Sequence, residues 1–194
     1  AIIAEGLTHR HHTGTPDRNP CHQYRHQQSH QNLHPVHPSW KRVADDGEVL
    51  YSVRSFPGYG KLSNKNPDDL EAGARVEVDK KKRDPMDFAL WKPAKPGEPK
   101  WPSPWCEGRP GWHIECSAMS IELLEGHVDL HIGGIDLRFP HHEDERAQSN
   151  CATNKEVINH WIHGEHLLFE GRKMSKSSGN VLLVKDVVEK GLDP

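Results

Sequence analysis

Three residues between positions 111 and 149 have side chains that could hold a metal ion. His141 and Glu145 are four residues apart, and a helix that begins at Pro140 would place them on one face, one turn from each other. Cys116 offers a thiolate from a second segment. A thiolate, an imidazole and a carboxylate together favour zinc over calcium or magnesium, because these hard cations bind sulfur and nitrogen poorly. From the three residues alone, a solvated helix face and a small buried cysteine explain the pattern equally well.

The segments around these residues alternate between strand-like and helix-like patterns. Gly133 and Gly134 follow one strand-like run and would let the backbone approach a ligand or another segment closely. Alternation of strands and helices indicates an α/β fold with a parallel sheet. The expected elements are a helix over 115–125, a strand over 128–132, a helix from 140, strand segments at 161–163 and 166–169, and a short helix over 184–190.

Residues 1–42 differ in composition from the rest of the chain. They hold eight of the sixteen histidines, and their few apolar residues show no helical or strand period. Such a segment buries too little surface to offset its ordering entropy, so we expect disorder or an unrelated sequence over 1–44. The pattern after residue 45 predicts strands over 48–53, 74–78 and 88–91, a helical turn over 66–71, a solvated charged turn over 79–84, and a proline-rich extended connection over 92–110.

Composition excludes several classes of protein. The formal net charge is −3 over 194 residues, which argues against a generally basic nucleic-acid binder but leaves room for a local basic patch. No run of eighteen apolar residues and no signal peptide is visible, so we expect a cytoplasmic protein. The four cysteines form no Cys-x-x-Cys pair, which favours a metal ligand or thiol over a disulfide framework.

A second motif, Lys-Met-Ser-Lys-Ser, occupies residues 173–177. Two lysines three residues apart beside hydroxyl groups form a cationic loop able to neutralise a triphosphate, although such a loop alone is weak support. Together with Gly-Trp-His-Ile-Glu-Cys-Ser-Ala-Met at 111–119 and Phe-Pro-His-His-Glu-Asp-Glu at 139–145, it resembles the cysteinyl-tRNA synthetase family of class I synthetases. Segments 56–63, 73–78 and 83–92 also resemble that family, so the resemblance extends from about residue 45 to residue 194.

This resemblance implies the fold class and the domain organisation. The fold would be α/β, the second half of a Rossmann-like catalytic domain with an inserted connective segment. The connective insertion would cover 45–110, and the catalytic half with the zinc ligands and the lysine loop would cover 111–180. Residues 181–194 would begin the linker to tRNA-binding domains.

The resemblance also implies the amino-acid site. Cys116, His141 and Glu145 match three of the family's four zinc ligands, and the zinc takes the thiolate of the substrate L-cysteine. A hydroxyl is a far poorer zinc ligand than a thiolate, so this arrangement would select cysteine over serine without editing. Trp112 and His131 would bind the substrate.

The catalytic and ATP-binding residues follow from the same resemblance. Lys173 and Lys176 would be catalytic, and Lys176 would bind ATP together with Gly133, Gly134 and Asp136, with Mg²⁺. In the family reaction the cysteine carboxylate attacks the α-phosphate of ATP, and the terminal adenosine of tRNA(Cys) then takes the acyl group. We expect a monomer that contributes positioning and charge stabilisation rather than a nucleophile.

Some positions depart from the family pattern. The chain contains no His-x-Gly-His motif and no cysteine near it to give the fourth zinc ligand, and Ile132 stands where the family has a glycine. These departures predict a catalytic-domain fragment of weak or no activity. Two alternatives remain: a cysteine ligase of thiol biosynthesis acting on an amino sugar, and a non-catalytic zinc-binding pseudoenzyme.

Overall fold

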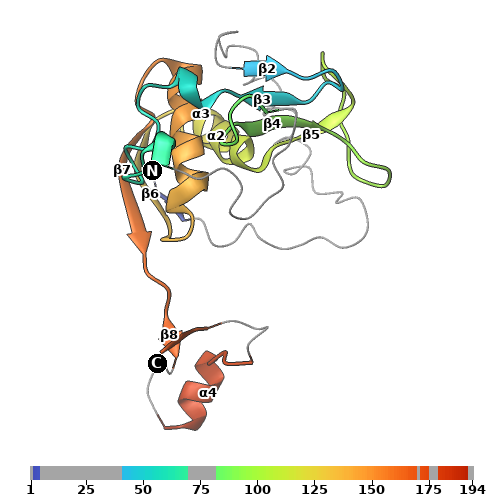
Figure 1. Cartoon of the computed structure of the whole chain (residues 1–194). Helices are drawn as coiled ribbons and strands as arrows, with labels where there is room; N and C mark the ends of the chain where they lie inside the picture. The colour runs from blue at the N-terminus through green and yellow to red at the C-terminus, as the bar shows by residue number, and fades with distance from the viewer. Residues whose placement is uncertain (1, 5–40, 70–81, 170, 175–178, 192–194) are drawn as a thin grey trace.

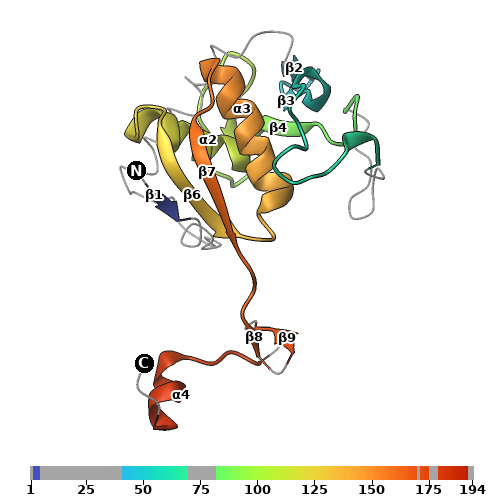
Figure 2. The same cartoon turned by 90° about the vertical axis from the view of Figure 1, so that its left-hand side faces the viewer.

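Two helices, α2 and α3, lie between two β-sheets in the computed structural model (Figures 1 and 2), which describes residues 2–4, 41–69, 82–169, 171–174 and 179–191. In chain order the elements are β1 (Ile2–Ala4), β2 (Lys41–Val43), β3 (Val49–Tyr51), the 3₁₀ turns η1 (Val53–Ser55) and η2 (Pro67–Asp69), β4 (Phe88–Pro93), β5 (Gly108–Pro110), α2 (Trp112–Leu123), β6 (Val128–Gly134), the turn η3 (Arg138–His142), α3 (Glu143–Thr153), β7 (Ile158–Gly164), β8 (Leu168–Phe169), β9 (Arg172–Lys173) and α4 (Val184–Glu189).

The parallel sheet has the strand order β1-β6-β7, which confirms the parallel arrangement expected from the sequence. β6 and β7 are in register from Val128 opposite Ile158 to Gly134 opposite Gly164. The helix α3 forms the crossover between them, as parallel pairing requires. β1 pairs with β6 on the other edge of this sheet. The expectation of disorder over 1–44 is therefore wrong for β1 and for β2, and residues 5–40 lie outside the described residues.

The antiparallel sheet has the order β2-β3-β4-β5 and packs against α2 and α3. Its buried side chains form one apolar cluster with residues of both helices: Val49, Tyr51, Val53, Tyr59, Phe88, Leu90, Trp91, Ile114, Ala147 and Cys151. The expectation of an extended surface connection over 92–110 is wrong. β5 returns alongside β4, and Trp101, Trp105 and Cys106 pack against the cluster, because aromatic side chains gain more from burial than the prolines between them lose in backbone hydrogen bonds.

The start of α2 differs from the expectation, whereas the helical backbone that leads into α3 starts where the sequence predicted. α2 begins at Trp112 rather than at residue 115, directly after the extended Gly111 (φ −66°, ψ 161°). α3 is continuous from Glu143, and within the preceding segment η3 only Phe139 is non-helical (φ −142°, ψ 131°), so helical backbone extends back to Pro140, as the sequence predicted. The earlier start of α2 brings residues 112 and 113 into its first turn.

The C-terminal elements β8, β9 and α4 lie apart from the two sheets and follow the end of β7 (Figures 1 and 2). β8 and β9 form a short antiparallel pair, and α4 matches the helix expected near residue 184. The strand expected over 74–78 and part of the charged turn lie outside the described residues. Within the described part of the chain, no helix is both long and apolar enough to cross a membrane.

A glycine at the start of α2 sets the distance between this helix and β4. A Cβ atom on Gly111 would lie 1.9 Å from the carbonyl oxygen of Ala89, so Gly111→Ala must displace backbone. We expect Gly111→Ala to lower the free energy of unfolding by about 1–3 kcal/mol, the usual cost of overpacking, in urea denaturation. Gly164→Ala is the control, since its nearest atom would be 4.0 Å away. Equal losses in the two variants would contradict this account.

Candidate metal centre

The structure brings Cys116, His141 and Glu145 together, although they come from α2, η3 and α3. One ligand atom of each lies within 4.8 Å of the others, and all three residues are buried. His141 Nε2 is 2.9 Å from Glu145 Oε1 and 3.7 Å from Cys116 Sγ. The three donor atoms therefore face one point.

This donor set fits zinc by chemistry and by spacing. Zinc bonds to sulfur, nitrogen and oxygen are about 2.0–2.3 Å long, which places the donor atoms of a tetrahedral site roughly 3.3–3.8 Å apart. The distance of 3.7 Å between His141 Nε2 and Cys116 Sγ lies in this range, and the distance of 2.9 Å between His141 Nε2 and Glu145 Oε1 is shorter. Burial of a carboxylate and a thiol next to an imidazole is costly unless the charges are compensated, and a divalent cation compensates them.

Polar contacts between α2 and α3 hold the ligands in place. Ser117 Oγ accepts hydrogen bonds from Ser149 Oγ and from Gln148 Nε2, both at 2.7 Å. Ser117 follows Cys116 directly, and residues 148 and 149 lie one turn after Glu145. These contacts therefore fix the helix that carries the thiol against the helix that carries the carboxylate.

His113 lies beside the ligand cluster and was not singled out by the sequence reasoning. Its Nδ1 is 2.6 Å from His141 Nδ1, and its Nε2 is 3.2 Å from Asp144 Oδ2. Asp144 Oδ1 accepts a hydrogen bond of 2.5 Å from the hydroxyl of Tyr59. His113 lies in the segment 111–119 and Asp144 in the segment 139–145, both of which resemble the family. These segments are the sequence signal that could have identified the two residues.

Electrostatics around Asp144 follow from its burial. Burial raises the pKa of the Asp144 carboxyl, while the hydrogen bond from Tyr59 and the nearby His141 act in the opposite direction. Burial also raises the pKa of the Tyr59 hydroxyl, and the neighbouring Asp144 adds to this shift. Tyr59 is therefore a hydrogen-bond donor at neutral pH.

His131 lies on the other side of Glu145, in the middle of β6, where it pairs with Trp161 of β7. It is fully buried, its Nε2 is 3.3 Å from Glu145 Oε2, and its ring stacks on Trp161 with centroids 4.6 Å apart. His142 and His163 continue this group through a contact of 2.8 Å between their ring nitrogens. Desolvation lowers the pKa of His163, and the nearby His142 contributes in the same direction.

The other predicted substrate and ATP residues near the ends of β6 and α2 differ in their exposure. Trp112 is 45% exposed, and its ring stacks on His141 with centroids 4.3 Å apart, so it borders the ligand cluster. Asp136 is exposed and lies 3.6 Å from His166. A Cβ atom on Gly133 would lie 2.6 Å from the ring of His142, and one on Gly134 would lie 2.4 Å from Asp136 Oδ1.

Two further predictions concern residues away from the cluster. Lys173 is in β9, among the C-terminal elements that lie apart from the sheets (Figure 1), so the structure does not bring it to the ligands; Lys176 lies outside the described residues. Ile132 alternates along β6 with His131 and Gly133, which face α3. Because neighbouring side chains of a strand point to opposite faces, Ile132 faces away from the metal ligands.

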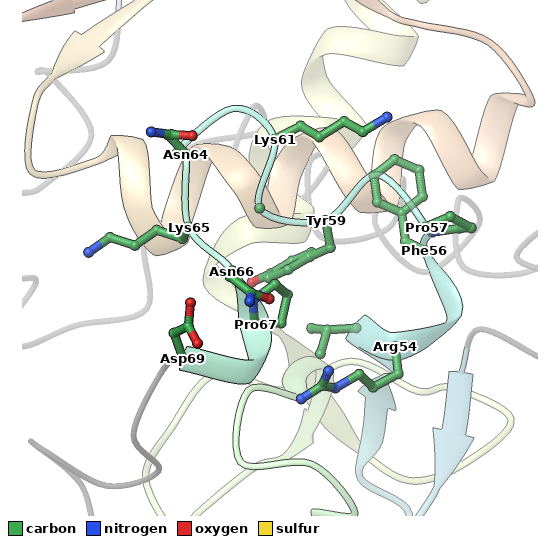
Figure 3. Close-up of a pocket in the computed structure, with 12 residues that line it drawn as sticks. Arg54, Phe56, Pro57, Tyr59, Lys61, Asn64, Lys65, Asn66, Pro67 and Asp69 are labelled. Carbon is green, nitrogen blue, oxygen red and sulfur yellow. The ribbon is translucent and has the colours of Figure 1, made fainter.

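A cavity of about 610 Å³ lies under the loop between residues 53 and 69. Figure 3 shows Tyr59 beneath this loop, while the side chains of Lys61 and Lys65 extend outward from it. The lining residues are Val53, Arg54, Phe56, Pro57, Tyr59, Gly60, Lys61, Asn64, Lys65, Asn66, Pro67 and Asp69. The cavity shares Tyr59 with the hydrogen bonds around Asp144 but contains none of the three candidate ligands.

Comparisons with known proteins agree on one family. A family model described as the tRNA synthetases class I (C) catalytic domain matches residues 36–192. A cysteine–tRNA ligase of Alkalilimnicola ehrlichii is 62% identical over 146 residues, which is 75% of this chain and 32% of the relative. Cysteine–tRNA ligases of Bdellovibrio bacteriovorus (62% over 149 residues, 77% of this chain and 31% of the relative) and Halorhodospira halophila (57% over 146 residues, 75% and 32%) are similar. The chain spans about a third of the length of these curated relatives.

Replacing the thiol tests whether the cluster binds zinc. We expect Cys116→Ser to weaken zinc binding by more than the roughly 10- to 100-fold typical of changes outside the ligands, because a hydroxyl is a poor zinc ligand. Competition with a chromogenic chelator measures this affinity. Cys106→Ser is the matched control, since Cys106 lies in the apolar cluster of the antiparallel sheet. Unchanged affinity in Cys116→Ser would exclude this site.

Proposed function

Because the chain belongs to the class I (C) tRNA synthetase catalytic-domain family, we propose that it serves the ATP-dependent activation of L-cysteine and its transfer to tRNA(Cys). The observation that carries this proposal is the buried cluster of Cys116, His141 and Glu145. A pocket that selects a hydroxyl or an apolar amino-acid side chain would not need a thiolate and an imidazole at this spacing. The names of the curated relatives support tRNA, rather than an amino sugar, as the acceptor.

Selection of cysteine is the task we assign to this cluster. Zinc bound there would supply a Lewis-acidic centre that prefers a thiolate to a hydroxyl. Trp112, partly exposed and stacked on His141, forms a wall of the amino-acid pocket. His131, held between Trp161 and Glu145, orients that carboxylate from the opposite side.

The chemical step needs no protein nucleophile. The substrate carboxylate attacks the α-phosphate of ATP, pyrophosphate leaves, and Lys173 and Lys176 offset the charge on the leaving group, with Mg²⁺ on the phosphates. Gly133, Gly134 and Asp136 at the end of β6 bind the adenosine side of ATP. Since Lys173 lies in β9, apart from β6, this role requires β9 to approach the sheet during the reaction.

The division of the domain that we assign separates most strands of one sheet from most strands of the other, although β1 and β2 come from residues 1–44. The parallel strands β6 and β7 with α3 belong to the Rossmann-like second half, over residues 111–180. The antiparallel strands β3, β4 and β5 form the connective insertion over 45–110. In this assignment the insertion packs against the catalytic half through α2 and α3, rather than standing free of it.

A cobalt-loaded chain tests cysteine recognition directly. We expect L-cysteine to produce a saturable thiolate-to-metal charge-transfer band beyond that of Cys116, and L-serine to produce none at the same concentration, because only the thiol offers a soft donor. Ultraviolet absorption titration measures both. An equal response to the two amino acids, or none to cysteine, would refute the assigned specificity.

Isotope exchange between ATP and pyrophosphate distinguishes an enzyme from a non-catalytic zinc protein. Exchange that depends on L-cysteine supports the ligase function, and Lys176→Ala should reduce it because the leaving group loses a countercharge. Absence of exchange alone would also fit a weak or inactive fragment, so a cysteine-dependent cobalt signal without any binding of ATP is the result that would favour the non-catalytic zinc-binding alternative.

A further inference from the structure

We propose that Tyr59, Asp144 and His113 form a hydrogen-bonded chain that determines which ring nitrogen of His141 carries a hydrogen, and so keeps Nε2 available to the metal. This inference rests on the zinc site of the proposed function. It assigns positioning roles to three residues that are not themselves ligands.

The chain begins at the two nitrogens of His141, which face different partners. Nε2 faces the ligand cluster, 2.9 Å from Glu145 Oε1 and 3.7 Å from Cys116 Sγ. Nδ1 faces His113 Nδ1 at 2.6 Å. A neutral imidazole has one N–H, and a metal-binding nitrogen must be the other one. When Nε2 binds a metal, Nδ1 of His141 therefore donates its hydrogen to His113.

His113 then has to accept on one nitrogen and donate on the other. With Nδ1 as the acceptor, its hydrogen is on Nε2, which lies 3.2 Å from Asp144 Oδ2. Tyr59 donates to the second oxygen, Asp144 Oδ1, at 2.5 Å. Both carboxylate oxygens of Asp144 therefore accept a hydrogen bond, one from His113 and one from Tyr59. If His113 Nδ1 instead donated to His141 Nδ1, the hydrogen of His141 would be on Nε2, and this nitrogen could not bind the metal.

Packing restricts rotation of the rings in this chain. Trp112 stacks on His141 at an interplanar angle of 24°, and Phe88 meets the His113 ring edge-on at 84° with centroids 5.5 Å apart. Tyr59 is buried in the apolar cluster and lies beneath its loop next to α3 (Figure 3). Tyr59 and Phe88 both lie within residues 45–110. This segment therefore contacts the metal site through the hydrogen bond from Tyr59 to Asp144 and through the packing of Phe88 on His113.

A neighbouring contact provides a matched comparison. Glu143 Oε2 accepts hydrogen bonds from Ser63 N at 2.9 Å and from Ser63 Oγ at 2.8 Å. Like Asp144, Glu143 is a buried acid in the first turn of α3 that anchors the same loop. Glu143 bonds to Ser63, whereas Asp144 bonds to His113 and Tyr59. If Asp144 only anchored the loop, removing either acid would have the same effect on the metal.

Zinc affinity distinguishes a role of Asp144 in positioning His113 from a role only in anchoring the loop. We expect Asp144→Leu to weaken zinc binding by about 10- to 100-fold, the usual effect of removing a partner of a metal-binding histidine. Asp144→Asn should retain most of the affinity, because the amide oxygen can still accept from His113 Nε2. Glu143→Leu should leave the affinity within about threefold of the unaltered chain. Chelator competition on each full chain, with circular dichroism to confirm folding, gives these values.

Nitrogen-15 NMR of the histidine rings in the zinc-loaded chain gives an independent readout. We expect His113 to show N–H character at Nε2 and His141 at Nδ1, and Asp144→Leu to change the His113 pattern while Asp144→Asn preserves it. The inference is overturned if the unaltered chain binds zinc but Asp144→Leu binds it as tightly, or if the hydrogen is on His113 Nδ1. Failure of the proposed function would look different, since the unaltered chain would then bind no zinc or show no response to cysteine.

Discussion

The close approach of α2 to α3 is the contact on which the rest of the site depends. Ser117 and Ser149 meet at 2.7 Å between hydroxyl oxygens, and Ala118 and Ala147 are fully buried nearby. Small side chains let the two helix backbones come close, and the hydroxyls satisfy each other where water is excluded. Without this contact a thiol from one helix could not meet an imidazole and a carboxylate from the next.

The first turn of α3 collects three acids that serve different neighbours. Glu143 holds the loop at Ser63, Asp144 contacts Tyr59 and His113, and Glu145 lies between His141 and His131. The N-terminus of a helix favours negative charge, which helps a single turn hold several buried carboxylates. The parallel sheet, through His131, and the loop between β3 and β4, through Tyr59 and Ser63, are therefore connected to the ligand cluster through one turn of one helix.

Sequence patterns predicted the element types better than their ends. Apolar spacing and turn residues predicted the strand at 128, the strand segment at 161–163, which lies within β7, and the short helix at 184. The sequence did not predict the pairing of β5 with β4. The segment before Gly108 is rich in proline, which argues against a strand, and the packing of its aromatic side chains depends on residues elsewhere in the chain. The start of α2 lies three residues before the predicted residue 115, directly after the extended Gly111.

The sequence by itself determined the family, through motifs at 111–119, 139–145 and 173–177, and it named the ligand types, because the i, i+4 spacing of His141 and Glu145 is a local property of a helix. Only the tertiary structure decided which residues surround those ligands. Tyr59 reaches Asp144 across 85 positions, and His113 reaches His141 across 28. Contacts over such separations depend on how helices and sheets pack, which no local pattern of residues specifies.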